Sequence, residues 1–180
     1  GGKGSRRERE KRVVLAGLVV AVRSRITQSG RRLGFVTLDD RTARLEVILF
    51  GDVYQRYRHL LEKDRLIVVE GDLGYDEFSD GYRVSAERVH DLAGARMAFA
   101  RRLVLRVDAA KAGNGFIGHL HKALEPYQNG DCTVCIDYEG AGASARVRLG
   151  EAWRVRPEAA LIERLTTLLP EQSVQLDYHR

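Results

Sequence analysis

The segment "VVLAGLVVAVRSRIT", from Val13 to Thr27, decides how this chain folds. It is rich in β-branched residues, which predicts a strand, but it is longer than an ordinary strand. Gly17 near its middle predicts a bend or a bulge. A long bent strand can pair with different neighbours along its two halves, which is what closing a small barrel requires.

With this first strand included, the first 92 residues predict three strands, a helix and then two more strands. Leu45, Val47 and Leu49 lie at alternate positions of the third strand, so they are expected to share one face of it. This order predicts the five-stranded OB-fold β-barrel over residues 13–92, with its helix between strands three and four. The expected elements after the first strand are strands at 33–40 and 43–50, a helix at 51–63, and strands at 64–76 and 82–92.

A second unit follows, and its pattern predicts a mixed fold class for the whole chain. Residues 93–100, "AGARMAFA", predict a helical connector. Residues 101–180 then predict a small α+β domain with the order βαββαβ. Its expected elements are strands at 101–108, 132–139, 143–150 and 173–178, and helices at 115–127 and 157–169, the second with Pro157 in its first turn.

The composition limits the class of protein. Of the 180 residues, 44% are hydrophobic, which suits one or two folded domains and is too high for a disordered chain. No apolar run approaches the length of a membrane-spanning helix, so we expect no membrane partner. Two cysteines are too few for a disulfide framework, which favours the cytoplasm.

The positive charge is unevenly distributed. The net charge is +5, and residues 1–12 alone hold six Lys or Arg and two Glu. Residues 13–92 carry a net charge of −1 and residues 93–180 a net charge of +2. We therefore expect residues 1–12 to be a disordered basic tail, and the opening "GGKGS" to be an expression remnant or a cut within a longer protein. A nucleic-acid site on either folded unit must be a local patch.

Several strings together resemble one family. "VVLAGLVVAVRSRIT", "GRRLGFVTLDDRTARLEVILFGDVYQRYRHLLEKDRLIVVEG", "ARRLVLRV" and "RLGEAWRVRP" are similar to the C-terminal region of the bacterial DNA polymerase III alpha subunit. The resemblance covers nearly all of residues 13–180. It implies an OB domain that binds template single-stranded DNA and a last domain that docks the tau subunit of the clamp loader, within the polymerase III holoenzyme. It also implies that the polymerase active site lies upstream, so this fragment itself is expected to be non-catalytic.

Phe35 is the first candidate for DNA contact. Alternation along "LGFVTLDD" places Leu33, Phe35 and Thr37 on one face and Val36 and Leu38 on the other. Because Val36 and Leu38 suit the barrel core, we expect Phe35 to be displayed outward. An exposed ring on this face of an OB-fold is a platform for stacking bases. The alternative is a bulge that re-phases the strand and buries the ring.

Arginines and aromatic residues extend the predicted site. Four arginines flank the loop between the first two strands, which is a common nucleic-acid rim of OB-folds, and a fifth lies on strand three. The loop between strands four and five is acidic, but it carries three rings that can stack on bases. The full set of predicted DNA-binding residues is Arg23, Arg25, Arg31, Arg32, Phe35, Arg44, Tyr75, Phe78 and Tyr82.

The sequence predicts no catalytic residue, metal site or cofactor. Asp39 and Asp40 suit a tight turn better than a metal pair, since no third carboxylate is near. Cys132 and Cys135 have CxxC spacing, but on a strand they face opposite sides, which predicts ordinary packing. His119 and His121 are two apart on a helix and cannot share a face.

Other roles remain open for parts of the chain. Trp153 is expected in the core of the second unit, with a partner anchor as the alternative. Residues 175–179, "QLDYH", are expected to form a closing strand rather than a peptide that docks in a sliding clamp. The tau-contacting residues are not specified by any pattern. Two rival functions for the barrel are an anticodon-binding module of a class II aminoacyl-tRNA synthetase and an architectural, protein-binding domain.

Overall fold

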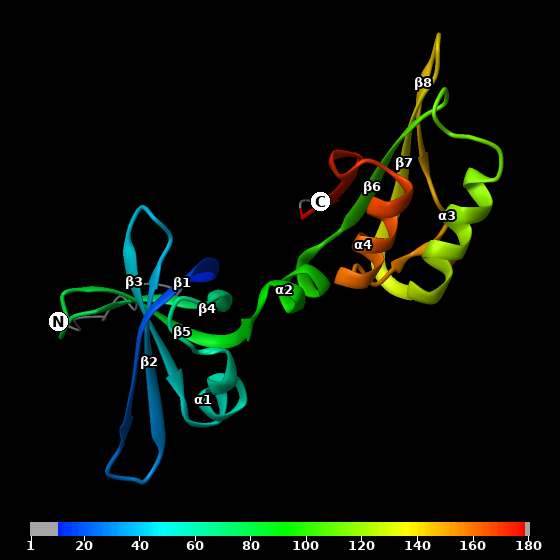
Figure 1. Ribbon diagram of the computed structural model, residues 1–180. Coiled ribbons are helices and arrows are strands. Elements are labelled where there is room, and N and C mark those ends of the chain that lie inside the picture. Colours follow the sequence, from blue (N-terminus) through cyan, green and yellow to red (C-terminus); the bar gives the residue numbers. More distant parts are fainter. Residues whose placement is uncertain (1–10, 179–180) are drawn as a thin grey trace, which may run out of the picture. The chain divides into compact units, whose positions relative to one another are not determined.

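A computed structural model describes residues 11–178 of the protein, and within them the chain divides after Leu92 into two compact units (Figure 1). The predicted basic tail lies outside the described residues up to residue 10. In the described part, no helix is both long enough and apolar enough to span a membrane.

The first unit is a closed barrel with strand order β1-β2-β3-β5-β4, which confirms the predicted OB-fold. Strands β3 and β5 pair in parallel, and all other pairs are antiparallel. The elements are β1 (Lys11–Ile26), β2 (Arg32–Asp39), β3 (Arg44–Phe50), helix α1 (Gly51–Tyr57), the 3-10 turn η1 (Arg58–Leu60), β4 (Leu66–Asp76) and β5 (Gly81–His90). The predicted helix is therefore shorter than expected, because its last turn tightens into η1.

Strand β1 closes the barrel by pairing with two partners. Its first half, up to Leu18, pairs with β4, and its second half pairs with β2, so Leu18 faces both Asp39 and Leu66. The bulge expected at Gly17 lies instead between Val19 and Ala21. Gly17 lets β1 and β2 approach closely, because a Cβ there would lie 3.1 Å from the carbonyl oxygen of Asp39.

The strand also begins earlier than expected. Lys11 and Arg12, which we assigned to the disordered tail, pair with Leu73 and Asp72 of β4. The guanidinium of Arg12 forms ion pairs with Glu87 and, at 3.8 Å, with Asp72. The prediction of disorder is thus wrong for these two residues, because ladder hydrogen bonds and acidic partners order them.

The barrel core contains the residues that alternation assigned to it. Val36, Leu38, Val47 and Leu49 are buried there, and Leu45 packs against them. The ring of Tyr54 on α1 packs on Gly34, where a Cβ would lie 2.1 Å from Tyr54 Cδ2.

The second unit is a four-stranded sheet of order β8-β7-β6-β9, preceded by the predicted helical connector α2 (Leu92–Phe99). Its order confirms the predicted βαββαβ pattern. The elements are β6 (Arg102–Asp108), α3 (Phe116–Leu124), the 3-10 turn η2 (Glu125–Tyr127), β7 (Gln128–Glu139), β8 (Ser144–Arg148), the 3-10 turn η3 (Glu151–Trp153), α4 (Ala159–Leu168), the 3-10 turn η4 (Glu171–Ser173) and β9 (Val174–Asp177).

Both cysteines of the second unit are free and buried, as the packing interpretation predicted. Cys132 lies with Leu103 and Leu105 in the core that packs against α3 and α4, whereas Cys135 lies opposite Val104 on the other face of the sheet. Burial raises the pKa of the Cys132 thiol to about 11, so this thiol stays protonated and unreactive at neutral pH.

Gly71 gives a test of the barrel geometry. The register of β4 against β5 shifts between Glu70 and Gly71, and a Cβ on Gly71 would lie 2.1 Å from the carbonyl oxygen of Ser85. Because the obstacle is backbone, we expect Gly71→Ala to lower the free energy of unfolding by about 1 to 3 kcal/mol in urea denaturation.

Gly74→Ala in the same strand is the matched control, since a Cβ at Gly74 meets nothing within 4 Å. Equal stability of the two variants would show that the shift at Gly71 is not a fixed part of the barrel.

Candidate nucleic-acid interface

Phe35 lies on the outer face of the barrel, as alternation predicted. The register places it opposite Arg23 of β1 and Ile48 of β3. Together with Leu33 and Ile48 it forms a small apolar cluster separate from the barrel core that contains Val36. The face of the strand was therefore predicted correctly.

The exposure of Phe35 was predicted wrongly. The residue is only 9% exposed, because three guanidinium groups lie around its ring. The Cζ atom of Arg23 is 4.6 Å from the ring centroid, and those of Arg25 and Arg83 are each 5.8 Å away. These are cation–π distances. This face therefore presents to solvent chiefly the positive guanidinium groups that cover the Phe35 ring.

Carboxylates hold two of these guanidiniums in place. Glu46 of β3 lies 3.3 Å from Nη2 of Arg23 and 2.7 Å from Nη2 of Arg83. Arg83 also lies 3.3 Å from Asp76. Glu46 Oε1, although it forms the ion pair with Arg83 Nη2, accepts no well-oriented hydrogen bond, and the buried Arg83 Nε donates none to the described residues. The site is thus ordered by ion pairs but not saturated by protein hydrogen bonds.

The loop between β4 and β5 forms the other wall of this site. Asp76 accepts hydrogen bonds from Ser79 Oγ at 2.8 Å and from the backbone N–H of Phe78 at 3.1 Å. These bonds, with the nearby charge of Arg83, lower the pKa of Asp76, so it stays ionised. Phe78 itself is fully exposed.

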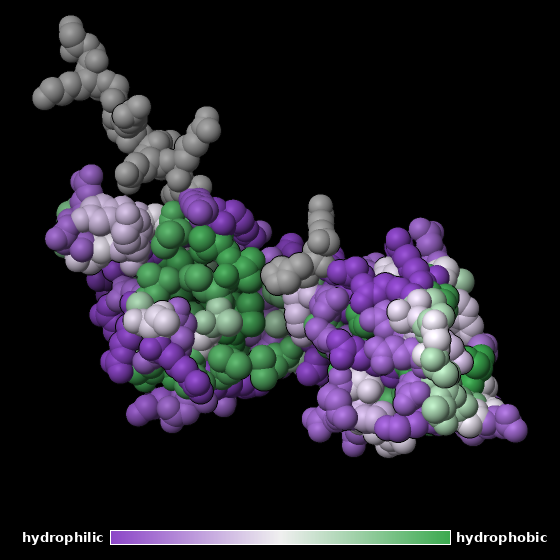
Figure 2. Space-filling model, turned by 90° about the horizontal axis from the view of Figure 1, so that it is seen from above, coloured by the Kyte–Doolittle hydropathy of each residue, from purple (hydrophilic) through white to green (hydrophobic). Residues whose placement is uncertain are grey.

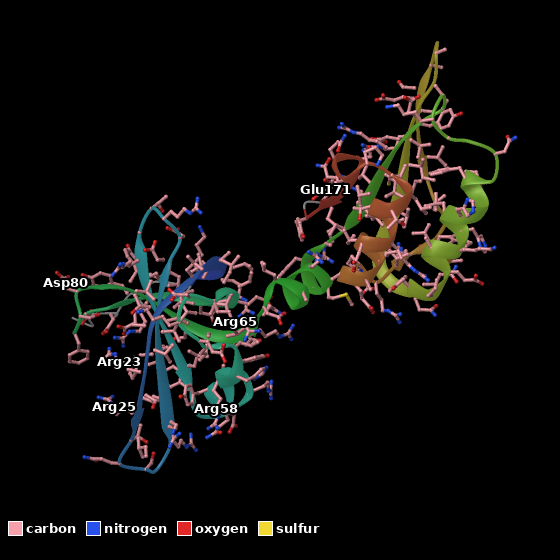
Figure 3. All side chains as sticks on the ribbon, in the orientation of Figure 1. Arg23, Arg25, Arg58, Arg65, Asp80 and Glu171 are labelled. Atoms are coloured by element: carbon pink, nitrogen blue, oxygen red, sulfur yellow. The ribbon has the colours of Figure 1, made fainter. Side chains whose placement is uncertain are left out.

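These elements enclose a hollow of about 650 Å³ on the outer face of the barrel, which we call the arginine hollow. Arg23 and Arg25 project from β1 toward the side of the loop that carries Asp80 (Figure 3). The hollow joins four of the predicted residues to four that were not predicted. Its lining is Arg23, Ser24, Arg25, Phe35, Asp76, Phe78, Ser79 and Arg83.

Arg31 and Arg32 lie elsewhere. They line a second hollow with Phe50 and Asp52 at the start of α1, and none of its lining residues belongs to the arginine hollow. Arg32 pairs with Ile26, one step out of phase with Arg25 and Leu33, so it points to the other side of the sheet. The predicted four-arginine rim is therefore two separate patches.

The other predicted residues do not line either hollow. Arg44 forms an ion pair with Asp39 at 3.6 Å. Tyr75 and Tyr82 face each other across β4 and β5, with their rings edge to face at 5.4 Å. They lie on the opposite side of this ribbon from Arg83, which is the neighbour of Tyr82 on the strand.

The turn interpretation of Asp39 and Asp40 is confirmed. Asp40 Oδ1 accepts hydrogen bonds from Thr42 Oγ1 and from the backbone N–H groups of Thr42 and Ala43, which lowers the pKa of Asp40. Asp39 Oδ1 accepts one from the N–H of Arg41. Within residues 11–178, no group of three or more His, Cys, Asp or Glu side chains is placed to hold a metal ion.

The barrel also carries apolar surface away from the arginine hollow. Val14 and Leu18 of β1 and Leu66 of β4 are exposed, and Leu18 and Leu66 pair directly. Figure 2 shows a broad apolar area on this unit. Such a surface suits contact with protein rather than with phosphate.

An apolar groove of about 490 Å³ lies on the second unit, between α3 and strands β7 and β8. Ile117, a large aliphatic residue at its rim, is 71% exposed. Val147 and Tyr138 are exposed too. Trp153 packs against the core but also lines this groove, with His121 edge to face at 4.6 Å, so it is less buried than a core position predicts. The closing strand predicted from "QLDYH" is confirmed through Asp177.

Comparison with known proteins shows which proteins the chain resembles. Residues 13–92 match the family described as OB-fold nucleic acid binding domain, and residues 119–169 match DNA polymerase III subunit alpha, C-terminal domain. The chain is 41% identical over 171 residues to the DNA polymerase III subunit alpha of Escherichia coli O157:H7, and 38% identical over 171 residues to that of Vibrio cholerae. The chain matches the C-terminal region of the DNA polymerase III alpha subunit.

The match to these alpha subunits covers 95% of this chain but only 15% of the relatives' length. It is the C-terminal part of the alpha subunit that the chain matches, not the catalytic part. The tRNA-synthetase alternative is not favoured, because the matched relatives are polymerase subunits.

Two solved structures resemble part of this chain. One is the SSB domain of a protein from Synechococcus sp., with 24% identity and a TM-score of 0.41, covering 44% of this chain and 92% of that chain. The other is the second single-stranded DNA binding protein of Mycobacterium smegmatis, with 18% identity and a TM-score of 0.41, covering 46% of this chain and 89% of that chain.

Proposed function

We propose that the barrel binds single-stranded DNA in the arginine hollow. One observation carries this proposal: the fully exposed ring of Phe78 stands beside the guanidiniums that cover Phe35. Bases offer flat faces that stack on rings and on guanidinium planes, and phosphates are drawn to the positive charges. In the parent alpha subunit, we infer that this strand is the template of a DNA-directed DNA polymerase whose active site lies upstream.

The hollow suits a single strand better than a duplex. Bases must be unstacked before they reach Phe78, and a duplex hides their faces. The barrel carries a net charge of −1 over residues 13–92, so it lacks the broad positive field that holds a duplex by its phosphates. Binding therefore depends on a few local contacts and is weak at physiological salt.

Salt dependence tests this proposal. At roughly −0.7 per neutralised phosphate, oligo-dT binding should have a log–log salt slope no steeper than about −2, the value reached when all three guanidiniums of the hollow meet phosphates. Arg25 forms no ion pair with any described residue, so Arg25→Ala should reduce the slope by about 0.7. Fluorescence anisotropy with oligo-dT, duplex and tRNA measures both affinity and slope. Binding of duplex or tRNA as tight as that of oligo-dT contradicts the proposal.

Two controls locate the binding site. A chain starting at Lys11 removes the four basic side chains before it, Lys3, Arg6, Arg7 and Arg9, which attract any nucleic acid. Phe78→Ala should weaken oligo-dT binding by about 1 to 3 kcal/mol. Phe50→Ala, an exposed ring at the Arg31 hollow, should leave it unchanged. The reverse result would move the site to that second hollow.

We further infer that the second unit docks the tau subunit of the clamp loader through the apolar groove. The groove is lined almost entirely by apolar side chains from α3, β7 and β8, which suits an apolar segment of a protein. The parent would thereby join the polymerase III holoenzyme. Two buried free thiols in the same unit agree with the reducing cytoplasm that we infer for the protein.

Neighbouring positions on α3 test the docking proposal. Ile117 lines the groove, whereas His119 on the same helix is exposed and does not. Ile117→Ser should weaken tau binding about tenfold in surface plasmon resonance, because buried apolar contact is lost, and His119→Ser should leave it unchanged. Val147→Ser on β8 should repeat the effect. Full tau affinity in both groove variants would place the docking surface elsewhere.

A further inference from the structure

The order of the groups in the arginine hollow limits what a base can touch. Phe35 is 9% exposed, whereas the side chain of Arg23, which lies over it at 4.6 Å, is 70% exposed. A base that enters the hollow therefore meets the guanidinium before it meets the ring. A guanidinium is planar and delocalised, so it stacks on a ring with one face and can stack on a base with the other.

We propose that the stacking surface of this site is the Arg23 guanidinium backed by Phe35, and that Glu46 is the positioning residue that holds its plane. This inference rests on the proposed single-strand binding and specifies which group meets the base. Phe35 serves as the support beneath the guanidinium, not as the platform itself. Glu46 reaches Arg23 at 3.3 Å and Arg83 at 2.7 Å, so one carboxylate fixes two of the three guanidiniums around the ring.

The rival arrangement is one in which DNA draws Arg23 away to a phosphate and bares Phe35 for the base. The two arrangements differ in the role of the carboxylate. If Arg23 moves to a phosphate, Glu46 competes with the DNA for it, and removing the charge of Glu46 strengthens binding. If Arg23 stays over Phe35, Glu46 keeps the plane in place, and removing its charge weakens binding although the site becomes more positive.

The test uses the full chain and oligo-dT, with affinity and salt slope measured for each variant. Glu46→Gln should weaken binding about five- to tenfold without a steeper salt slope, since about 1.4 kcal/mol is tenfold and one stacked base contributes about that much. Arg23→Lys should weaken it as much as Arg23→Ala, because Lys keeps the charge but has no plane to stack.

Arg44→Lys is the matched control. Arg44 is also exposed and paired to a carboxylate, Asp39 at 3.6 Å, but it does not line the hollow, so its replacement should change nothing. Unfolding midpoints of the Arg23 and Arg44 variants should equal that of the wild type, because both side chains are mostly exposed.

Each outcome decides the matter. Wild-type affinity in Arg23→Lys, or tighter binding with a steeper slope in Glu46→Gln, overturns the guanidinium stack while leaving single-strand binding intact. Failure of the unaltered chain to bind oligo-dT overturns the proposed function and this inference with it.

Discussion

The double pairing of β1 is the constraint on which the first unit depends. One strand must hydrogen-bond to β4 along its first half and to β2 along its second, and the change of partner falls at Leu18. At this change of partner a Cβ on Gly17 would lie in tight contact, 3.1 Å from the carbonyl oxygen of Asp39, and the register of β1 on β2 shifts between Val19 and Ala21. Arg23 and Arg25 lie on that second half. The pairing of β1 with β2 that closes the barrel therefore also places two guanidinium groups beside Phe35.

Much of this arrangement could be predicted from local pattern. Alternation alone separated Phe35 from Val36 and Leu38, since a strand exposes its two faces to different surroundings. The same rule could have sorted the rings of the β4–β5 loop. Tyr82 precedes Arg83 on one strand, so the two side chains must point to opposite sides, and Tyr82 cannot share the face of Phe35. The signal was present in the sequence, and applying it requires knowing which face Arg83 occupies.

The cover over Phe35 could not be predicted in this way. Arg83 reaches the ring because β5 pairs in parallel with β3, placing Arg83 beside Glu46, and no local pattern specifies that non-sequential pairing. The two arginine patches have a similar origin. The turn in which the Thr27 N–H donates to the Arg31 carbonyl fixes where β2 begins, and this sets Arg32 out of phase with Arg25. The arginines are close in sequence and were therefore predicted to form one patch. Their side chains point to different sides of the sheet, so they form two.

The carboxylates of the arginine hollow explain how a barrel with little net charge can still present an ordered positive surface. Glu46 and Asp76 reduce the field of the hollow, and a site that relied on charge alone would be better without them. They also restrict Arg23 and Arg83, which are long side chains with much conformational entropy to lose on binding. A guanidinium already held over a ring loses less of that entropy when a base arrives. The hollow thus gives up attraction at long range and gains orientation at contact, which agrees with the proposed binding of an unstacked strand.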